Sequence, residues 1–557
     1  MLKVLTTIAT VGFALAQKGA IKVNPESRLM EDAHNRSVLF HGVNVVYKVD
    51  PYIPSNDKFD PQLSMTDEDI DNLVKWGFNF VRLGVMWEAV ERSPDVFNHT
   101  YLQEVEKLVN KMGEKGIYTL VDAHQDVFAR HICGEGVPDF YASDDILDHK
   151  CTGGLIPWIA TLIGACKSIK DYGFRFDQNG DPLIEDCQKN NFAGYYPSPE
   201  SVSGFNRLYE NIGGLQDKFI NYWEYVSQYF ANNQYVLGYD PINEPFPSNI
   251  LTEPSLVYHP GKFDEEKLQP LYKRAYEKYY KADKSKIMFF ESAEFPDEIG
   301  ILGGFVFHLG FTEPPGGANN LTTQVLNDHS YCCQLSSDIC ATGEPSLDKA
   351  KECRDWHEDR INTRSEDAQK YGIPLFISEF GACLNSSSCV QEIKSLTDVC
   401  DEHLVGWAYW QYKNFADLTT SAGTASEGFF NNDGTLQDAK VKALARTYLQ
   451  STQGVLKSMN FNTENADFSA SFVADTSITQ PTVIYWSQEF WYPQGFSMKL
   501  TDSKGQVLAL DTDYKLDQST PNYTKVQIIN SALNQQLISL TLHAKYIEAV
   551  SVQALIQ

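Results

Sequence analysis

Beyond its first 16 residues, the chain lacks an apolar run long enough to cross a membrane. It is also poor in basic residues, because 46 lysines and arginines stand against 73 aspartates and glutamates, for a formal net charge of −27. So acidic a chain repels phosphates, and we expect no nucleic acid partner. Repeats and low-complexity tracts are absent from the sequence. With 557 residues, 43% hydrophobic and 13% aromatic, the chain suits a large core and more than one domain.

The first 16 residues predict a secretory signal peptide. Lys3 precedes an apolar run from Val4 to Leu15, and the small residues Ala14 and Ala16 suit a cleavage site. The run is too short for a membrane anchor. We therefore expect an exported protein without a membrane span, either secreted or delivered to a lysosomal or digestive lumen.

Eleven cysteines in an exported chain predict disulfides rather than a metal site. Because the number is odd, at least one thiol has no partner within the chain. Cys383 and Cys389 are near enough in sequence to close a short loop, and the remaining connectivity stays open. A second staple is expected among Cys332, Cys333, Cys340 and Cys353. Five sequons fit an exported glycoprotein, at Asn35, Asn98, Asn320, Asn385 and Asn522.

From about residue 38 to 450, short apolar strands alternate with helices. Eight strands separated by helices predict a (β/α)8 TIM barrel, whose active site lies at the carboxyl ends of the strands. An open doubly wound sheet is the alternative, but no glycine-rich phosphate motif follows the first strand. The predicted strands are Leu39–Val46, Phe78–Leu83, Tyr118–Asp122, Val236–Tyr239, Ile287–Phe290, Val325–Tyr331, Leu375–Glu379 and Val405–Trp410. Helices are predicted at Thr66–Lys75, Tyr101–Lys115, Leu215–Asn232 and Cys353–Tyr371.

After Gln453 the pattern changes to short β-rich runs, which predict a β-sandwich appended to the barrel. The expected domains are therefore the signal peptide at 1–16, a catalytic (β/α)8 barrel at 17–452 and a β-sandwich at 453–557. The sandwich either packs against barrel helices or binds a glycan or a surface.

One irregular stretch, residues 127–203, separates the third and fourth strands. Loops of this length are usually functional, and this one belongs to the side of a barrel that carries the active site. Its apolar piece at 153–164 is either a buried loop helix or a contact for a lipid tail.

Two glutamates stand where predicted strands end. Glu244 follows Asn243 just after the fourth strand, and Glu379 closes the seventh. In a barrel, both carboxylates would emerge at the same mouth. Glycoside hydrolysis needs such a pair, with one acid to protonate the leaving oxygen and a nucleophile or base opposite it. A single glutamate would more often cap a helix or lie in solvent, so the prediction depends on the pair.

Other polar residues near strand ends suit a sugar-binding cleft. Arg82 interrupts an apolar strand, and a buried arginine requires an acidic partner such as Glu379. After the third strand, His124 and Asp126 could hydrogen-bond sugar hydroxyls. We expect no metal there, because no third ligand stands at a suitable spacing. A tryptophan in the run Trp407–Trp410 could stack on a sugar face.

In these motifs the chain resembles glycoside hydrolase family five and, within it, the endoglycoceramidases. The two glutamate motifs and Arg82 are shared with the wider clan of retaining barrels. The narrower resemblance is carried by three runs: His41-Gly42-Val43-Asn44-Val45-Val46-Tyr47-Lys48, Asp122-Ala123-His124-Gln125-Asp126 and Gly134-Glu135-Gly136-Val137-Pro138-Asp139. The resemblance covers nearly the whole chain. It implies a retaining endo-glycosidase that hydrolyses the β-glycosidic bond between oligosaccharide and ceramide in a glycosphingolipid.

The resemblance also implies a role for each matching residue. Glu244 would be the general acid/base, and Glu379 the nucleophile. Support for the nucleophile would come from Arg82, His329 and Tyr331. The sugar would be bound by Lys48, His124, Asp126, Asn243, Tyr331 and Trp410. Neither a cofactor nor a metal is implied.

Some choices stay open at this point. Tyr47 and Trp407 could replace Lys48 and Trp410 in register. Ceramide requires an apolar groove, which we expect from residues 155–162 and from parts of 302–311. Lipid micelles or a membrane surface would then be peripheral partners.

To act as an acid, Glu244 needs a raised pKa, and the expected cause is the neighbouring charge on Glu379. Three rival functions remain: an endo-β-glucanase of the same family, a glucosylceramide β-glucosidase, and a silent glycolipid-binding protein. The sequence does not indicate the preferred glycan series or the oligomeric state.

Overall fold

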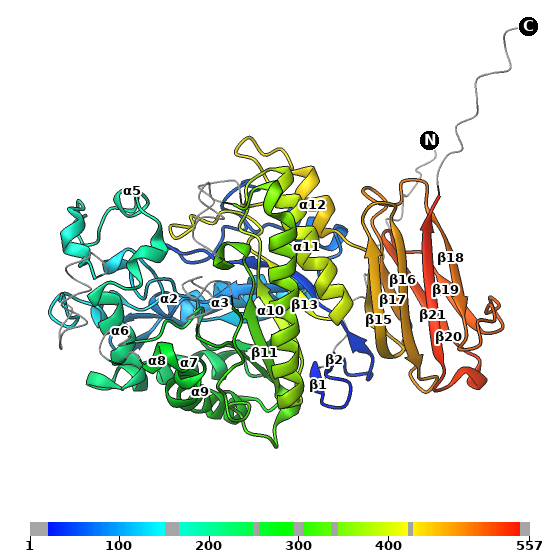
Figure 1. Ribbon diagram of the computed structural model, residues 1–557, viewed down its shortest axis with the longest axis horizontal. Coiled ribbons are helices and arrows are strands. Elements are labelled where there is room, and N and C mark those ends of the chain that lie inside the picture. Colours follow the sequence, from blue (N-terminus) through cyan, green and yellow to red (C-terminus); the bar gives the residue numbers. More distant parts are fainter. Residues whose placement is uncertain are drawn as a thin grey trace, which may run out of the picture.

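The computed structural model describes residues 20–150, 166–248, 253, 255–293, 305–335, 344–420 and 427–545. The predicted signal peptide lies outside these residues. Figure 1 shows two bodies side by side: a barrel wrapped by helices, mostly blue to yellow, and a pair of stacked sheets, mostly orange and red. Among the residues described, no helix combines the length and the apolar character that a bilayer span needs.

The larger body is a closed barrel of parallel strands, which confirms the predicted TIM barrel. The strands adjoin one another in the order β10-β11-β12-β13-β4-β5-β8-β9. Parallel pairing brings all their carboxyl ends to one mouth. All eight predicted strands are present, as β4 (His41–Val45), β5 (Phe80–Gly84), β8 (Tyr118–Asp122), β9 (Val236–Asp240), β10 (Ile287–Phe290), β11 (Gln324–His329), β12 (Leu375–Glu379) and β13 (Gly406–Tyr409).

The barrel interior is apolar at one end and polar at the other. Near the amino ends of the strands, side chains from the barrel and from the hairpin of β1 (Lys22–Asn24) and β2 (Leu29–Glu31) form one buried cluster. Its members are Ile21, Val23, Met30, Phe40, Phe80, Leu120, Leu237, Ile287, Phe289, Val325, Phe376 and Ala408. Farther along the strands, the buried side chains are instead Asn44, Arg82, Asp122, Asp240 and Asn327. Buried polar groups require hydrogen-bond partners. A layer of such groups at the carboxyl ends of the strands indicates that the functional site lies at the mouth.

Helices cover the outside of the barrel. Before α1 (Asp67–Lys75), Thr66 forms a capping box with Asp69, in which each side chain accepts from the other's backbone N–H. The four predicted helices are confirmed as α1, α3, α7 and α10. The remaining bounds are α2 (Trp87–Val90), α3 (His99–Glu114), α5 (Ile184–Cys187), α6 (Pro199–Tyr209), α7 (Leu215–Phe230), α8 (Ser255–Tyr258), α9 (Gln269–Ala282), α10 (Ala350–Tyr371), α11 (Ser387–His403) and α12 (Asp438–Leu444).

Disulfides fasten the loops at the mouth. Cys133 and Cys187 are bonded across 54 residues of the long stretch between β8 and β9. The apolar piece of that stretch, 153–164, lies outside the described residues. The predicted Cys383–Cys389 bond is present, and Cys400 is free and buried. Four further cysteines are also in disulfides: Cys332 and Cys353, which are bonded to each other, together with Cys166 and Cys333.

The smaller body is a β-sandwich, as predicted. One sheet has the order β15-β16-β21-β18, and the other has the order β1-β2-β3-β14-β17-β20-β19. Because β3 pairs with β14, strands from both sides of the expected boundary at 452/453 build this second sheet. The bounds are β3 (Ser37–Val38), β14 (Tyr448–Thr452), β15 (Gly454–Asn462), β16 (Asp467–Ala474), β17 (Thr482–Tyr485), β18 (Phe496–Thr501), β19 (Tyr514–Asp517), β20 (Tyr523–Ile528) and β21 (Leu537–Ala544). A separate small hairpin joins β6 (Glu91–Ser93) to β7 (Val96–Phe97).

Three tyrosines attach the sandwich to the barrel. The last carbonyl groups of a helix have no partner within the helix. Tyr485 and Tyr523 donate their hydroxyls to such carbonyls at the end of α1, at 3.1 and 2.8 Å, and Tyr448 donates to the Gly77 carbonyl just beyond the helix at 2.6 Å. This end of α1 leads into the amino end of β5, so these contacts hold the sandwich at the end of the barrel opposite the mouth.

Candidate active site

Glu379 is the last residue of β12, and its carboxylate has two partners at the mouth. Arg82 Nη1 lies 2.5 Å from Oε1, and Tyr331 donates its hydroxyl to Oε2 at 3.0 Å. Burial raises the pKa of Glu379 above its ordinary value, while His329 and Arg82 oppose that rise. The hydrogen bonds fix the orientation of the carboxylate and favour its ionised form.

Arg82 lies at the centre of the buried polar layer. Its guanidinium also contacts Asp240 Oδ2 at 2.9 Å, Asn243 Oδ1 at 2.8 Å and Asp122 Oδ1 at 3.2 Å. Burial disfavours the cation, but the surrounding carboxylates raise the pKa of Arg82 above its ordinary value. The expected acidic partner, Glu379, is therefore accompanied by two that sequence reasoning did not assign. Their signal was position, because Asp122 and Asp240 end β8 and β9.

Glu244 lies across the mouth from the nucleophile candidate, in a rare backbone conformation. Its φ is +38°, in the left-handed region that residues other than glycine seldom adopt. Glu291 Oε1 accepts the backbone N–H of Glu244 at 2.7 Å, and Gln125 Nε2 donates to the Glu244 carbonyl at 3.1 Å. Gln125 and Glu291 follow β8 and β10, the two neighbours of β9. Side chains from both adjacent strands therefore hold the segment after β9, and sequence reasoning assigned neither of them.

His329 lies between the two glutamates. Its Nδ1 is 2.8 Å from Glu244 Oε1 and 3.6 Å from Glu379 Oε2. One side-chain nitrogen or oxygen atom from each of Glu244, His329 and Glu379 lies within 4.8 Å of the other two. Burial lowers the pKa of His329 to about 4, so its imidazole is neutral near pH 7. Retaining glycosidases separate their carboxyl groups by about 5 to 5.5 Å and inverting ones by about 6.5 to 9.5 Å, so this close approach suits retention.

The pKa of Glu244 is raised, but the main cause differs from our expectation. Burial raises it to about 7, and the charge of Asp126 adds to the rise. Loss of contact with water, rather than the charge on Glu379, is therefore the largest effect. At pH values below about 7, Glu244 holds the proton that a general acid must give.

His124 and Trp410 form one wall of the mouth. Their rings stack with centroids 5.0 Å apart, and His124 Nδ1 lies 2.9 Å from Asp122 Oδ2. Burial disfavours a charged imidazole, but Asp122 and Asp126 together raise the pKa of His124 to about 10. His124 is therefore a cationic hydrogen-bond donor at neutral pH.

Lys48 is buried behind Trp410, among carboxylates. Its Nζ lies 2.6 Å from Asp126 Oδ2, 3.0 Å from Asp417 Oδ1 and 3.3 Å from Glu135 Oε1. The same ammonium group is 4.7 Å from the centroid of the Trp410 ring. Glu135 and Asp417 were not assigned from the sequence, although Glu135 belongs to a motif that carried the resemblance. These contacts orient Asp126 and Trp410 toward the mouth.

The two alternatives in register, Trp407 and Tyr47, have other neighbours. Trp407 is fully buried and stacks on His41 with centroids 4.2 Å apart, away from the mouth. Tyr47 is half-buried, and its ring centroid lies 6.3 Å from that of Phe415. The structure brings Lys48 and Trp410 together with His124.

The family described as Cellulase (glycosyl hydrolase family 5) matches residues 32–156 and 189–416. The Glycoside hydrolase family 5 C-terminal domain matches residues 446–535. The paired glutamates at the mouth of the barrel fit the glycoside hydrolase class. The family match shows that this chain belongs to glycoside hydrolase family 5.

Individual proteins are also similar to this chain. The chain is 28% identical over 498 residues to a protein of Cyanea nozakii named Endoglycoceramidase, covering 89% of this chain and 90% of the relative. It is 29% identical over 521 residues to the Endoglycoceramidase of Hydra vulgaris, covering 90% of this chain and 89% of that relative. A solved structure, Endo-glycoceramidase II from Rhodococcus sp. with a five-membered iminocyclitol, shares the fold with a TM-score of 0.67. That likeness has 19% identity and covers 93% of this chain and 100% of the other.

Proposed function

We propose that the protein is a retaining endo-glycosidase that hydrolyses the β-glycosidic bond between the oligosaccharide and the ceramide of a glycosphingolipid. Membership of glycoside hydrolase family 5 supports the reaction class. Similarity to two proteins named Endoglycoceramidase along 89% and 90% of this chain supports the choice of substrate. Neither a metal nor a cofactor takes part in the proposed reaction.

The proposed mechanism is based on the closeness of both glutamates to one histidine, His329. Glu379, held by Arg82 and Tyr331, attacks the anomeric carbon as a carboxylate and forms a glycosyl-enzyme ester. In the same step the bond to the ceramide oxygen breaks, and that oxygen takes the proton of Glu244. The neutral His329 lies 2.8 Å from Glu244 and orients its carboxyl group.

Water completes the cycle from the side that ceramide has left. Glu244, now ionised, removes a proton from the water while the water oxygen attacks the anomeric carbon. The ester bond to Glu379 breaks, which releases the oligosaccharide with its original anomeric configuration and restores both carboxyl groups.

The sugar side of the cleft is assigned to polar and aromatic groups. His124 and Asp126 offer a donor and an acceptor, Asn243 lies beside Arg82, and Trp410 offers a stacking face. Lys48 acts by holding Asp126 and Trp410 in place, because the ammonium group is already surrounded by carboxylates.

The lipid side of the cleft is assigned to the loops that follow β8 and β10. Of the expected apolar segments, 155–162 and 302–304 lie outside the described residues. The described part of the second segment includes Phe305, whose side chain is 68% exposed, beside the partly buried Val306. In this proposal the exposed side chain of Phe305 would contact the ceramide chains or the surface of a micelle or membrane.

Export and modification belong to the same proposal. The signal peptide at 1–16 and the five sequons support a secreted or luminal glycoprotein. Buried and partly buried disulfides support an oxidising compartment.

The decisive experiment is product analysis with lactosylceramide and a ganglioside. Free ceramide together with an intact oligosaccharide of β configuration, detected by mass spectrometry and early-time NMR, is the expected result. Monosaccharide alone would indicate a glucosylceramide-type β-glucosidase, and cleavage of a soluble β-glucan but not of glycolipid would indicate an endo-β-glucanase. Binding without any product would indicate a silent glycolipid-binding protein.

A further inference from the structure

Helix α10 packs against the segment that presents His329 and Tyr331 to the glutamates. The strand β11 ends at His329, and the backbone N–H of Ser330 extends the sheet by donating to the Glu379 carbonyl at 3.1 Å. Tyr331 therefore lies beyond the strand. The position of its hydroxyl depends on contacts other than the ladder of the sheet.

One face of α10 supplies such contacts. Positions 353, 356, 357 and 360 have the spacing that places side chains on the same side of a helix. Arg360 Nε donates to the His329 carbonyl at 2.6 Å, and Trp356 Nε1 donates to the Tyr331 carbonyl at 3.1 Å. The backbone on both sides of Ser330 is thus tied to the helix.

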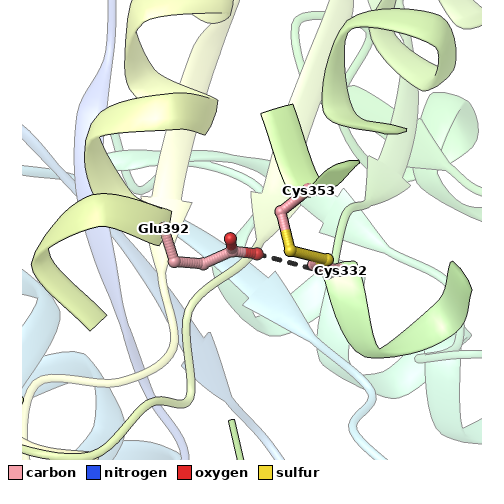
Figure 2. A group of neighbouring side chains, drawn as sticks. All are labelled: Cys332, Cys353 and Glu392. Carbon is pink, nitrogen blue, oxygen red and sulfur yellow. Dashed lines mark hydrogen bonds between the residues drawn. A yellow bond between two sulfur atoms is a disulfide. The ribbon is translucent and has the colours of Figure 1, made fainter. Parts of the chain in front are cut away.

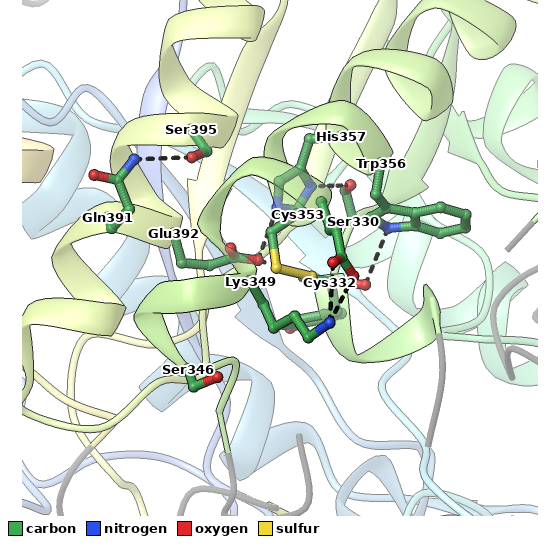
Figure 3. Close-up of a disulfide and its surroundings, with 12 residues drawn as sticks. Ser330, Cys332, Ser346, Lys349, Cys353, Trp356, His357, Gln391, Glu392 and Ser395 are labelled. Atoms are coloured by element: carbon green, nitrogen blue, oxygen red, sulfur yellow. Dashed lines mark hydrogen bonds and ion pairs between the residues drawn. A yellow bond between two sulfur atoms is a disulfide. The ribbon is translucent and has the colours of Figure 1, made fainter. Parts of the chain in front are cut away.

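A buried relay of Ser330, His357 and Glu392 adds a third tie. Figure 3 shows the chain of contacts, in which Ser330 Oγ lies 2.7 Å from His357 Nδ1, and His357 Nε2 lies 2.7 Å from Glu392 Oε1. The same oxygen of Glu392 accepts the N–H of Cys332 at 3.3 Å, beside the Cys332–Cys353 disulfide (Figure 2). Ser330 and His357 are 0% exposed, and Glu392 is 7% exposed.

This relay has the residue types of a hydrolase triad but not its geometry. In such a triad the serine contacts Nε2 and the carboxylate contacts Nδ1, whereas the order here is reversed. The Ser330 hydroxyl is also fully buried, so a substrate does not reach it. Side chains alternate in direction along an extended segment. Ser330 therefore points to α10 while its neighbours His329 and Tyr331 point into the mouth.

We propose that His357 is a positioning residue for the glycosidase reaction, which with Trp356 and the Cys332–Cys353 disulfide sets the Tyr331 hydroxyl against Glu379. The inference rests on the proposed function and deepens it. A hydrogen bond from Tyr331 favours the ionised nucleophile. When the segment loosens, that bond is lost, the pKa of Glu379 rises, and attack at the anomeric carbon slows.

The test is a double-mutant cycle of His357→Ala and Tyr331→Phe on lactosylceramide and an aryl lactoside. Each single change should lower kcat by about tenfold or more, the effect of one hydrogen bond to a charged group, with little change in KM. The acid limb of the kcat/KM profile should move to higher pH in both. The double variant should fall no more than about twofold below Tyr331→Phe, because both changes act through one bond.

Trp356→Phe tests the same positioning of Tyr331 with a smaller change in volume. Phenylalanine keeps an aromatic ring at this position but lacks the N–H that donates to the Tyr331 carbonyl. This variant should shift the acid limb in the same direction, and it decides the question if His357→Ala does not fold. His403→Ala, at an exposed histidine of α11, is the matched control and should leave the profile unchanged. Folding of every variant is checked by circular dichroism and thermal unfolding.

Additive losses in the double variant, or an unmoved acid limb in the folded variants, would overturn this inference alone, provided that the wild-type protein is active. A folded wild-type protein without activity on either substrate would instead overturn the proposed function and this inference with it. The two failures are therefore distinguishable from the wild-type assay.

Discussion

Arg82 Nη1 and Glu379 Oε1 lie 2.5 Å apart inside the barrel mouth, although 297 positions separate the two residues in the sequence. The contact joins β5 to β12, which do not pair directly in the barrel. Because Arg82 also contacts Asp240 and Asn243, one guanidinium links the acidic nucleophile candidate to the strand that leads to Glu244. We therefore expect a substitution at either glutamate to alter the contacts of Arg82 on both sides of the mouth.

Glu379→Gln should abolish turnover and leave the protein folded. Glutamine has nearly the same shape and its amide oxygen still accepts a hydrogen bond, but it is not a nucleophile. We expect kcat to fall on the order of 10⁴-fold or more, as when the nucleophile of other hydrolases is removed. Glu358→Gln, an exposed position on α10, is the matched control. Steady-state kinetics together with the melting temperature check this prediction, and retained hydrolysis within tenfold of wild type would refute the assignment.

The pH dependence of kcat/KM should be bell-shaped, with its alkaline limb set by Glu244. Reaction requires Glu379 ionised and Glu244 protonated, so activity falls as pH rises through the Glu244 pKa, raised by burial to about 7. Asp126→Asn removes a negative charge that contributes to this rise. We therefore expect its alkaline limb to move to lower pH, whatever the change in maximal rate. An alkaline limb at an unchanged pH in this variant would contradict the role given to Asp126.

Glu291→Ala should impair catalysis through the backbone of Glu244. Glu291 accepts the Glu244 N–H at 2.7 Å and thereby stabilises a backbone with φ of +38°. Without that acceptor, the chain relaxes toward a commoner conformation and Glu244 loses its alignment with the leaving oxygen. We expect kcat to fall by about tenfold to a hundredfold with a smaller change in KM. Glu277→Ala, exposed on α9, serves as the control, and equal activities of the two variants would count against this role.

The strands and the glutamate pair could be predicted because their signals are local. Each barrel strand is a short apolar run, and Glu379 stands at the end of one. The need of Arg82 for an acidic partner was also foreseeable, since a buried arginine requires an acid. Such arguments use only the residue and its neighbours in the sequence.

The rest of the site depends on which segments the fold brings together. The bond from Glu244 to Glu291 exists only because β9 and β10 are neighbours. Lys48 receives carboxylates from two separate loops, Asp126 and Glu135 after β8 and Asp417 after β13, and no spacing in the sequence indicates that set. The N-terminal strand β3 joins the sandwich for the same reason, because its partner β14 lies more than 400 residues later in the chain.

Lys48→Met should destabilise the protein more than the loss of an exposed ion pair does. The substitution keeps most of the side-chain volume but leaves Asp126, Asp417 and Glu135 without their shared cation. Removing one partner of a buried ion pair costs about 3 to 5 kcal/mol. Lys115→Met breaks the exposed pair with Asp71 and should cost about 1 kcal/mol or less. Chemical denaturation at pH 7 measures both losses.

The loss at Lys48 should also depend on pH with a definite sign. Burial opposes ionisation of Asp126, but Lys48 lowers its pKa below the ordinary value in the folded protein. A depressed carboxyl pKa gives stability above the unfolded value, and that stability is lost as pH falls toward the folded pKa. The difference in unfolding free energy between wild type and Lys48→Met should therefore shrink as pH falls below about 4. A difference that stays constant across that range, or that matches the Lys115→Met control at pH 7, would show that Lys48 is not the cation on which the buried carboxylates depend.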